Sequence, residues 1–166
     1  MGQPLAYFIT FSTYGTHLPG SDKGWVDKRH RIPGSPVLIG NERMAGYWEA
    51  RLKEPAFVLK QSERGVVLEA VLGVCVYKGW VAHGVHVRTN HIHAVVGGEA
   101  KPERMMAVFK SYATRGLRAN RGCQRERFWT DHGSTKYLWK EVSVKAAVEY
   151  VLNGQGTKME CFPDGA

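Results

Sequence analysis

The sequence has few cysteines and none of the spacings that bind metal or build a disulfide framework. It contains three, Cys75, Cys123 and Cys161, and no two of them form a Cys-x-x-Cys pair. An odd number of widely spaced cysteines argues against both a disulfide scaffold and a cysteine zinc site. Cys75 stands among apolar residues, so we expect it to be an ordinary core residue.

The sequence also lacks a long apolar run. The longest extends from Val66 to Tyr77 and is interrupted by Glu69, whereas a helix needs roughly 20 apolar residues to cross a bilayer. The first residues, MGQPLAYFITF, contain no basic leader followed by an apolar stretch and a small-residue cleavage site. These absences predict a cytoplasmic protein that does not enter a membrane.

Acidic residues are scarce relative to basic ones. The 166 residues include 23 Lys and Arg against 15 Asp and Glu, which gives a formal net charge of +8. Such a charge favours a polyanionic partner, with nucleic acid first and an anionic membrane surface second. Hydrophobic residues make up 43% of the chain. That content and length predict one domain of ordinary size over residues 1–166.

Hydrophobic periodicity predicts an α+β fold. The predicted elements, in chain order, are a strand over 5–13, a short helix over 44–53, a helix over 61–78, strands over 80–88 and 90–97, a helix over 102–120, one or two strands within 128–139, and a helix over 144–153. The segment from residue 14 to 55 is rich in Gly and Pro, and the tail from residue 157 is expected to be frayed. The order predicts a ferredoxin-like or RNA-recognition-like sandwich, an antiparallel sheet with helices on its faces and a C-terminal helix that carries a tyrosine.

Two histidines stand on the second strand of the predicted hairpin. Residues two apart on a strand point to the same face, so His91 and His93 project side by side while Ile92 points into the core. Two imidazoles on one strand face can chelate one divalent ion, and imidazole suits Zn, Mn, Fe or Ni better than it suits Mg alone. The other histidines of the hairpin, His83 and His86, are expected to be structural or to face nucleic acid.

One tyrosine on the last predicted helix lies outside that helix's apolar stripe. The stripe recurs at helical spacing over Val144, Ala147, Val148, Val151 and Leu152. Tyr150 falls away from it and is available for chemistry. A phenol is almost wholly protonated at pH 7, so its attack on a phosphodiester needs a group that polarises the phosphate. A metal on the histidine pair would supply that help, so the pair and Tyr150 make more chemical sense together than apart.

Three motifs stand in a fixed order along the chain. They are the Asn-His-hydrophobic-His strand beginning at Asn90, a basic helix followed by the aromatic-rich segment 128–139, and a late helix with the sequence Tyr-Val-Leu-Asn-Gly-Gln beginning at Tyr150. The opening strand, with its Tyr-Phe-Ile-Thr-Phe run, fits the same pattern. Together these motifs resemble the single-tyrosine HUH transposases, particularly the REP-associated tyrosine transposase branch. The resemblance covers nearly the whole chain.

The resemblance implies a specific reaction. Members of the family cut one DNA strand by tyrosine attack, which forms a 5′-phosphotyrosine link and a free 3′-OH, and another 3′-OH then attacks that link and rejoins the strands. The covalent link conserves the bond energy, in keeping with the absence of a GxxxxGK[ST] phosphate-binding loop. By this resemblance Tyr150 is the nucleophile, His91 and His93 hold Mg or Mn, and the substrate is single-stranded or hairpin DNA.

The chain departs from the family at two places. Arg88-Thr89 replaces the usual Met-Pro before the histidine motif, which alters a turn and not a ligand. The third metal ligand is typically an amide four residues after the tyrosine, where this chain has Gly154. Asn153 and Gln155 are the alternatives, and we favour Gln155 because the Asn-Gly pair breaks the helix. The break would also allow exchange of the tyrosine helix in a homodimer, as in the insertion-sequence branch, whereas the REP-associated branch resembles a monomeric version.

Basic and aromatic residues are the predicted DNA contacts, since single strands bind in basic grooves with stacking aromatics. The candidates are Arg104, Lys110, Arg115, Arg118 and Arg121 of the second long helix and Trp25, Arg29 and Arg31 of the long loop. Three alternatives to a transposase-like enzyme stay open. They are a non-catalytic module that binds single-stranded DNA or RNA, a replication initiator or mobilisation nickase, and a metal-dependent hydrolase without a covalent step.

Overall fold

A five-stranded antiparallel sheet organises the chain, and its helices lie on both faces. The computed structural model describes residues 2–16, 42–120 and 123–164. Four of the predicted DNA contacts, Trp25, Arg29, Arg31 and Arg121, lie outside these ranges. The elements are β1 (Ala6–Thr13), α1 (Glu42–Glu49), α2 (Gln61–Lys78), β2 (Val81–Val87), β3 (His91–Gly97), α3 (Pro102–Ala119), β4 (Trp129–Leu138), α4 (Glu141–Asn153) and β5 (Glu160–Phe162).

The sheet has the strand order β4-β1-β3-β2-β5, and all its neighbouring strands are antiparallel. The predicted α+β class, the hairpin and the helix that carries the tyrosine are therefore confirmed. The hairpin turn is as tight as predicted, since the Arg88 N–H donates to the His91 carbonyl at 2.9 Å. The segment around Gly133 forms one strand of ten residues rather than two short ones.

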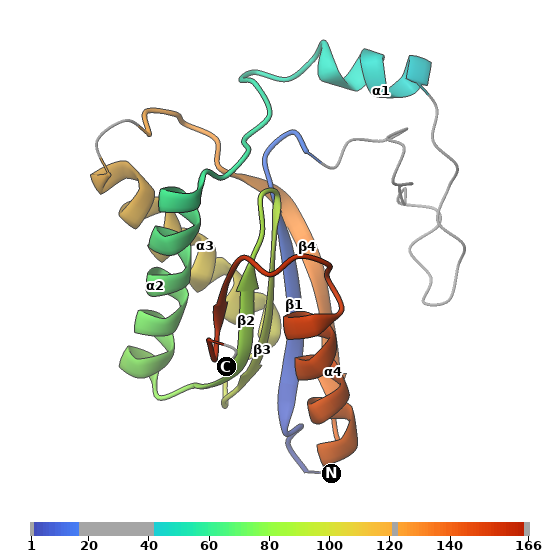
Figure 1. The fold of residues 1–166 in the computed structure, drawn as a ribbon, viewed down its shortest axis with the longest axis vertical. Helices are drawn as coiled ribbons and strands as arrows, with labels where there is room; N and C mark the ends of the chain where they lie inside the picture. Colours follow the sequence, from blue (N-terminus) through green and yellow to red (C-terminus); the bar gives the residue numbers. More distant parts are fainter. Residues whose placement is uncertain (1, 17–41, 121–122, 165–166) are drawn as a thin grey trace.

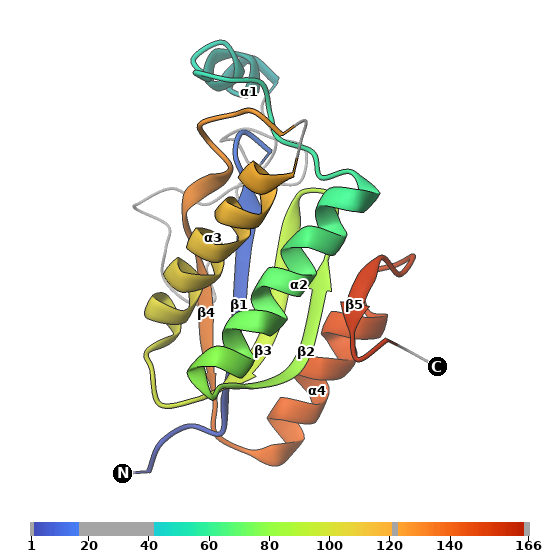
Figure 2. The ribbon, with the colours of Figure 1, turned by 90° about the vertical axis from the view of Figure 1, so that its left-hand side faces the viewer.

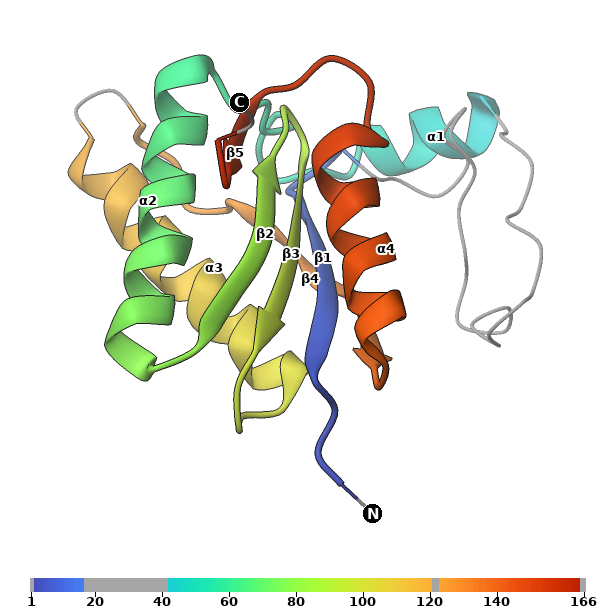
Figure 3. The same ribbon diagram turned by 60° about the horizontal axis from the view of Figure 1, so that its bottom comes forward.

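The two faces of the sheet are covered unequally. Figure 3 shows α2 and α3 on one face and α4 alone on the other. Figure 2, from another side, shows α2 and α3 packed next to each other in front of the strands. The larger core lies under these two helices and contains the alternate strand residues Ile9, Phe11 and Ile92 together with Phe109 of α3. A smaller core under α4 contains Ala6, Val95, Leu138 and Val151.

Strand pairing places the histidine strand at the centre of the sheet. β3 lies between β1 and β2, so Thr10 and His86 are the Cα partners of His93 on its two sides. All three side chains therefore point to the face that α4 covers. Ile92 points to the opposite face, where the larger core lies. The predicted division of this strand into a histidine face and a core face is confirmed.

The tail after α4 is ordered, and the prediction that it is frayed was wrong. Residues 160–162 form β5, which pairs with the edge of β2. The Glu160 carboxylate also accepts a hydrogen bond from the Arg64 guanidinium of α2 at 2.5 Å. A three-residue strand is too short to show alternation in the sequence, and these contacts with distant residues fix it.

The remaining elements add little to the core. α1 buries none of its residues, and Figure 1 shows it beyond the end of the sheet, away from the other helices.

The three cysteines are buried free thiols, and Cys75 belongs to the larger core as expected. Within the described ranges no helix is both long enough and apolar enough to cross a membrane.

Candidate active site

His91 and His93 lie side by side on the face of β3 that α4 covers. Their ring centroids are 4.7 Å apart, and the rings meet edge to face. His93 is 7% exposed, whereas His91, nearer the hairpin turn, is half-buried. The pair therefore has one imidazole inside the protein and one towards solvent, so a ligand could reach the pair from the side of His91.

A second contact orients each imidazole. The His91 Nδ1 lies 2.6 Å from the Asn90 Oδ1, and an amide oxygen only accepts, so this nitrogen carries the proton. In its neutral form this ring therefore has its lone pair on Nε2. The His93 Nδ1 lies 2.8 Å from the Thr10 hydroxyl, which can accept its proton in the same way. Contacts of this kind fix the tautomer and orientation of imidazoles that bind metals.

The environment of His93 keeps its ring neutral. Burial is the main cause, with the neighbouring His91 second, and together they lower the pKa of His93 from 6.5 to about 4, although a hydrogen bond with Gln155 partly opposes them. Deprotonated imidazole is the form that binds a metal. At neutral pH His93 is therefore in the form that a metal site requires.

Tyr150 of α4 stands over this pair. Its ring centroid is 6.0 Å from that of His93, and Phe8 of β1 contacts both rings, since it stacks on His93 at 5.5 Å and meets Tyr150 edge on at 6.1 Å. Tyr150 is 50% exposed, as its position outside the apolar stripe predicts. The structure thus brings the predicted nucleophile and the histidine pair together within a single chain.

The end of α4 determines which amide lies near the histidines. The helix ends at Asn153, and the Gly154 N–H donates to the Tyr150 carbonyl at 2.9 Å. Asn153 is exposed and donates to the Glu149 carboxylate at 2.9 Å. Gln155, beyond the helix end, has its side chain in hydrogen-bond contact with His93. Of the two amides, Gln155 is therefore the one directed to the pair.

Gly154 is packed tightly against the tyrosine. A Cβ at this position would lie 2.8 Å from the Tyr150 carbonyl oxygen and 2.9 Å from its Cδ2. Real Cβ atoms are essentially never found within 3.0 Å of such atoms, so one of the two groups would have to move. A side chain at position 154 would consequently displace the Tyr150 ring or the start of the following segment.

The donor set fits a divalent metal if Gln155 takes part. The described ranges contain no group of three His, Cys, Asp or Glu side chains suited to a metal ion, so two imidazoles need another kind of ligand. The Gln155 Nε2 position is buried and has no hydrogen-bond partner in the described parts of the chain. The amide oxygen of Gln155 is the atom that can coordinate a cation, whereas its N–H groups can only donate, for example to a phosphate oxygen.

His86 has a structural role. Its ring is fully buried, and its Nε2 accepts the Met159 N–H at 3.0 Å, so its Nδ1 carries the proton and donates to the Val151 carbonyl at 2.8 Å. Burial lowers the pKa of His86 as well. These two bonds attach the end of α4 and the following segment to β2. Because Val151 follows Tyr150 directly and Met159 follows Gln155 by four residues, the two bonds restrict the positions of Tyr150 and Gln155.

The predicted basic helix lies on the other side of the sheet. α3 packs against α2, β1 and β4, on the face opposite α4 (Figure 3). Arg104, Arg115 and Arg118 are exposed there. Lys110 instead donates to the Thr130 carbonyl of β4 at 2.8 Å and is partly buried, which lowers its pKa. The structure therefore does not bring these four residues together with Tyr150.

Several neighbours of the pair have no signal of their own in the sequence. Phe8 and Thr10 lie on the same face of β1 by strand alternation, but only the pairing of β1 with β3 shows that this face carries the histidines. Lys136 likewise comes to the side of Tyr150 through the pairing of β4 with β1, and Lys140 lies at the start of α4. Alternation predicts which residues share a face, and topology decides what that face contacts.

Comparisons with known proteins give no match in sequence and a distant similarity in structure. No family model matches the sequence, and no curated protein matches it. Among solved structures, the chain is similar to a REP-associated tyrosine transposase bound to a REP hairpin, with a TM-score of 0.49 and 10% identity over 91% of this chain and 66% of that one. A similarity this distant says nothing about chemistry, which has to be inferred from the residues of this chain.

Proposed function

We propose that this protein cuts and rejoins single-stranded or hairpin DNA through a covalent link to Tyr150, assisted by a divalent metal. The observation that carries the proposal is the approach of the Tyr150 ring to within 6.0 Å of the His93 ring, beside the histidine pair. A structural tyrosine on a sheet-packed helix does not need two oriented imidazoles next to it. The motif order that resembles the HUH transposases points to the same chemistry.

The metal in this proposal is Mg or Mn, held by His91, His93 and Gln155. The two imidazoles have the orienting contacts described above, and the amide oxygen of Gln155, whose side chain contacts His93, would supply the remaining protein ligand. A bound Mg²⁺ or Mn²⁺ would polarise the scissile phosphate and stabilise the charge that builds on its oxygens. Asn153 remains paired with Glu149 and takes no part.

The chain's own residues then perform the transfer. The Tyr150 oxygen attacks the phosphorus and forms a 5′-phosphotyrosine bond, while the bond to the 3′ oxygen breaks and leaves a 3′-OH. The phenol proton leaves to solvent, which reaches Tyr150 because that side chain is 50% exposed. Attack of another 3′-OH on the same phosphorus reverses these changes and releases Tyr150. Phe8, in contact with both rings, holds Tyr150 near His93.

A denaturing gel tests this proposal directly. Labelled single-stranded hairpins from the DNA that flanks the gene are incubated with the protein and Mn²⁺ or Mg²⁺. We expect a protein–DNA adduct that Tyr150→Phe abolishes, and we expect His91→Ala to lower the rate of adduct formation by roughly a thousandfold or more. Both variants should keep the wild-type free energy of unfolding within about 0.5 kcal/mol. Cleavage that survives Tyr150→Phe would indicate a metal-dependent hydrolase. Binding without any cleavage across a hairpin panel would indicate a non-catalytic nucleic-acid-binding module.

A further inference from the structure

A groove runs along the sheet beside Tyr150, between β4 and α4. It has a volume of about 500 Å³. Phe8, Leu138, Ala146 and Ala147 contribute apolar surface to it, and Tyr150 stands at its border. Because Phe8 also stacks on His93, the groove leads directly to the proposed reaction centre.

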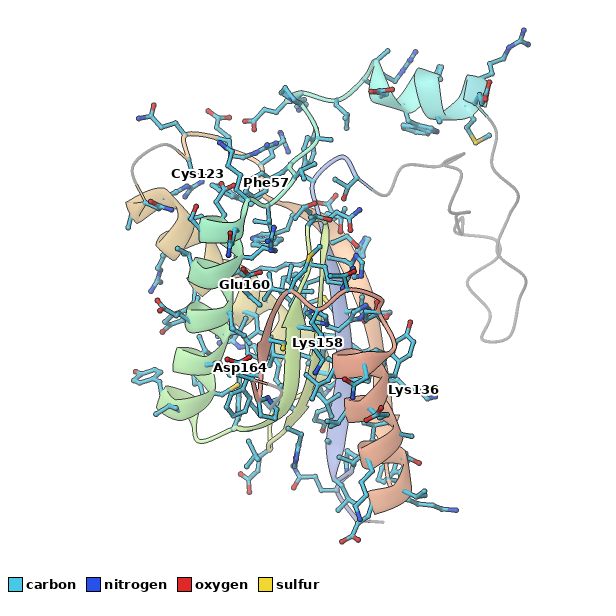
Figure 4. All side chains as sticks on the ribbon, in the orientation of Figure 1. Phe57, Cys123, Lys136, Lys158, Glu160 and Asp164 are labelled. Atoms are coloured by element: carbon cyan, nitrogen blue, oxygen red, sulfur yellow. The ribbon has the colours of Figure 1, made fainter. Side chains whose placement is uncertain are left out.

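The border of the groove carries positive charge. Lys136 and Lys140 line it. Tyr137 and Trp139 also contribute lining atoms, but the Tyr137 ring packs against Tyr7 of the larger core and contacts the Trp139 ring. Figure 4 labels Lys136 next to α4. Neither lysine forms an ion pair within the parts of the chain that the structure describes.

The negative charges of α4 stand apart from this groove. Glu141 and Glu149 are exposed, but neither lines it. An anion placed between the two lysines therefore meets no lining carboxylate. An apolar wall with cations at its border suits a single-stranded nucleic acid, since a base packs on the wall and phosphates pair with lysines.

The size of the groove restricts what can enter. Sites of roughly 300–1,000 Å³ hold small ligands, so this one has room for about one nucleotide. We infer that the groove holds a nucleotide of the single-stranded substrate next to the phosphodiester that Tyr150 attacks, with its base on the apolar wall and a phosphate at Lys136 and Lys140. This inference rests on the proposed function, because Tyr150 defines which phosphodiester is meant.

Filling the groove tests the inference without removing charge or chemistry. Ala146 is exposed on α4, so Ala146→Phe adds a ring to the groove without disturbing a core. The matched control is Val142→Phe, on the same helix, 69% exposed and outside the lining. Binding is measured in the Tyr150→Phe background by the anisotropy of a labelled oligothymidylate of about 12 nucleotides.

We expect Ala146→Phe to weaken binding about tenfold, as removal of one stacked base would, and Val142→Phe to change it less than about twofold. Equal effects of the two phenylalanine variants, or no binding of the probe by the parent protein, would overturn the inference.

Charge is tested separately by salt dependence. The double change Lys136→Ala and Lys140→Ala should reduce the slope of log affinity against log salt by about 0.7 for each phosphate that a lysine no longer neutralises. Lys145→Ala, an exposed lysine of α4 outside the lining, should leave the slope unchanged. An unaltered slope in the double variant would refute the pairing of these lysines with a phosphate.

The adduct assay separates the two proposals. If the wild-type protein forms the Tyr150 adduct but Ala146→Phe forms it as fast and binds as tightly, the groove inference fails and the proposed function stands. If no adduct forms and Ala146→Phe still weakens binding of the probe selectively, the proposed function fails. The groove is then a binding site for single-stranded DNA without the chemistry.

Discussion

The two faces of the sheet differ in what they bury and in what they leave open. Under α2 and α3, strand residues such as Phe11 and Ile92 are fully buried with Phe109 of α3. Under α4, the smaller core leaves room for polar groups, a groove and a tyrosine that is 50% exposed. Burial of apolar area supplies most of the folding free energy, so one face carries stability while the other is available for chemistry.

Truncation of one phenylalanine on each face gives the sharpest contrast. Phe109 is fully buried in the larger core, so Phe109→Ala should cost about 3–5 kcal/mol of unfolding free energy. Phe8 is half-buried between His93 and Tyr150, and Phe8→Ala should cost only about 1–2 kcal/mol but slow adduct formation more than tenfold per folded molecule. Urea unfolding measures the stability of both variants, and the adduct assay measures their rates of adduct formation. Equal decreases in stability in both variants would contradict the division between the faces.

The pH dependence of stability should come mainly from the α4 face. The pKa of His93 is lowered to about 4 in the folded protein, whereas the unfolded chain binds that proton near pH 6.5. The free energy of unfolding therefore has its full value, as far as His93 is concerned, above pH 6.5, and it declines as the pH falls towards 4. The total decrease is at most about 3 kcal/mol.

Urea unfolding between pH 7 and pH 4, with chelator present, checks this expectation. His93→Asn removes the titrating ring, and its stability should vary less with pH than that of the wild type. Some slope will remain in the variant, because burial lowers the pKa of His86 too. Identical pH profiles of the two proteins would show that His93 is not held neutral.

A methyl group at either of two glycines provides the smallest and most specific test. Gly154→Ala should displace Tyr150, because the added Cβ would lie 2.9 Å from its ring, and we expect adduct formation to fall roughly tenfold to a hundredfold. Gly73→Ala in α2 meets no atom within 4 Å and should raise stability by about 0.5–1 kcal/mol. An unchanged adduct rate in Gly154→Ala would mean that the position of Tyr150 is not critical.

Sequence patterns predicted the elements that are long enough to show a period. The strand 90–97 and the helices 61–78 and 102–120 match β3, α2 and α3 within a residue or two. The three-residue strand β5 lay below that limit, since only its contacts with β2 and Arg64 define it.

The candidate site was predictable in its chemical groups but not in its surroundings. His91 and His93 were placed on one face by alternation, and Tyr150 was placed outside the apolar stripe by helical spacing. Charge predicts that α3 contacts DNA, and this stays a prediction, but charge does not say which face of a sheet a helix covers, and α3 lies on the face opposite Tyr150 (Figure 3). Thr10 and Phe8 could not be assigned without the pairing of β1 with β3.

The origin of the site residues has a consequence for when the protein becomes active. Thr10 and Phe8 come from the first strand, the histidine pair from the middle of the chain, and Tyr150 and Gln155 from the last helix and the segment after it. During synthesis, a nascent chain carries the imidazoles long before the nucleophile has emerged. If Tyr150 is the nucleophile that we propose, chains that end before α4 cannot form the covalent adduct.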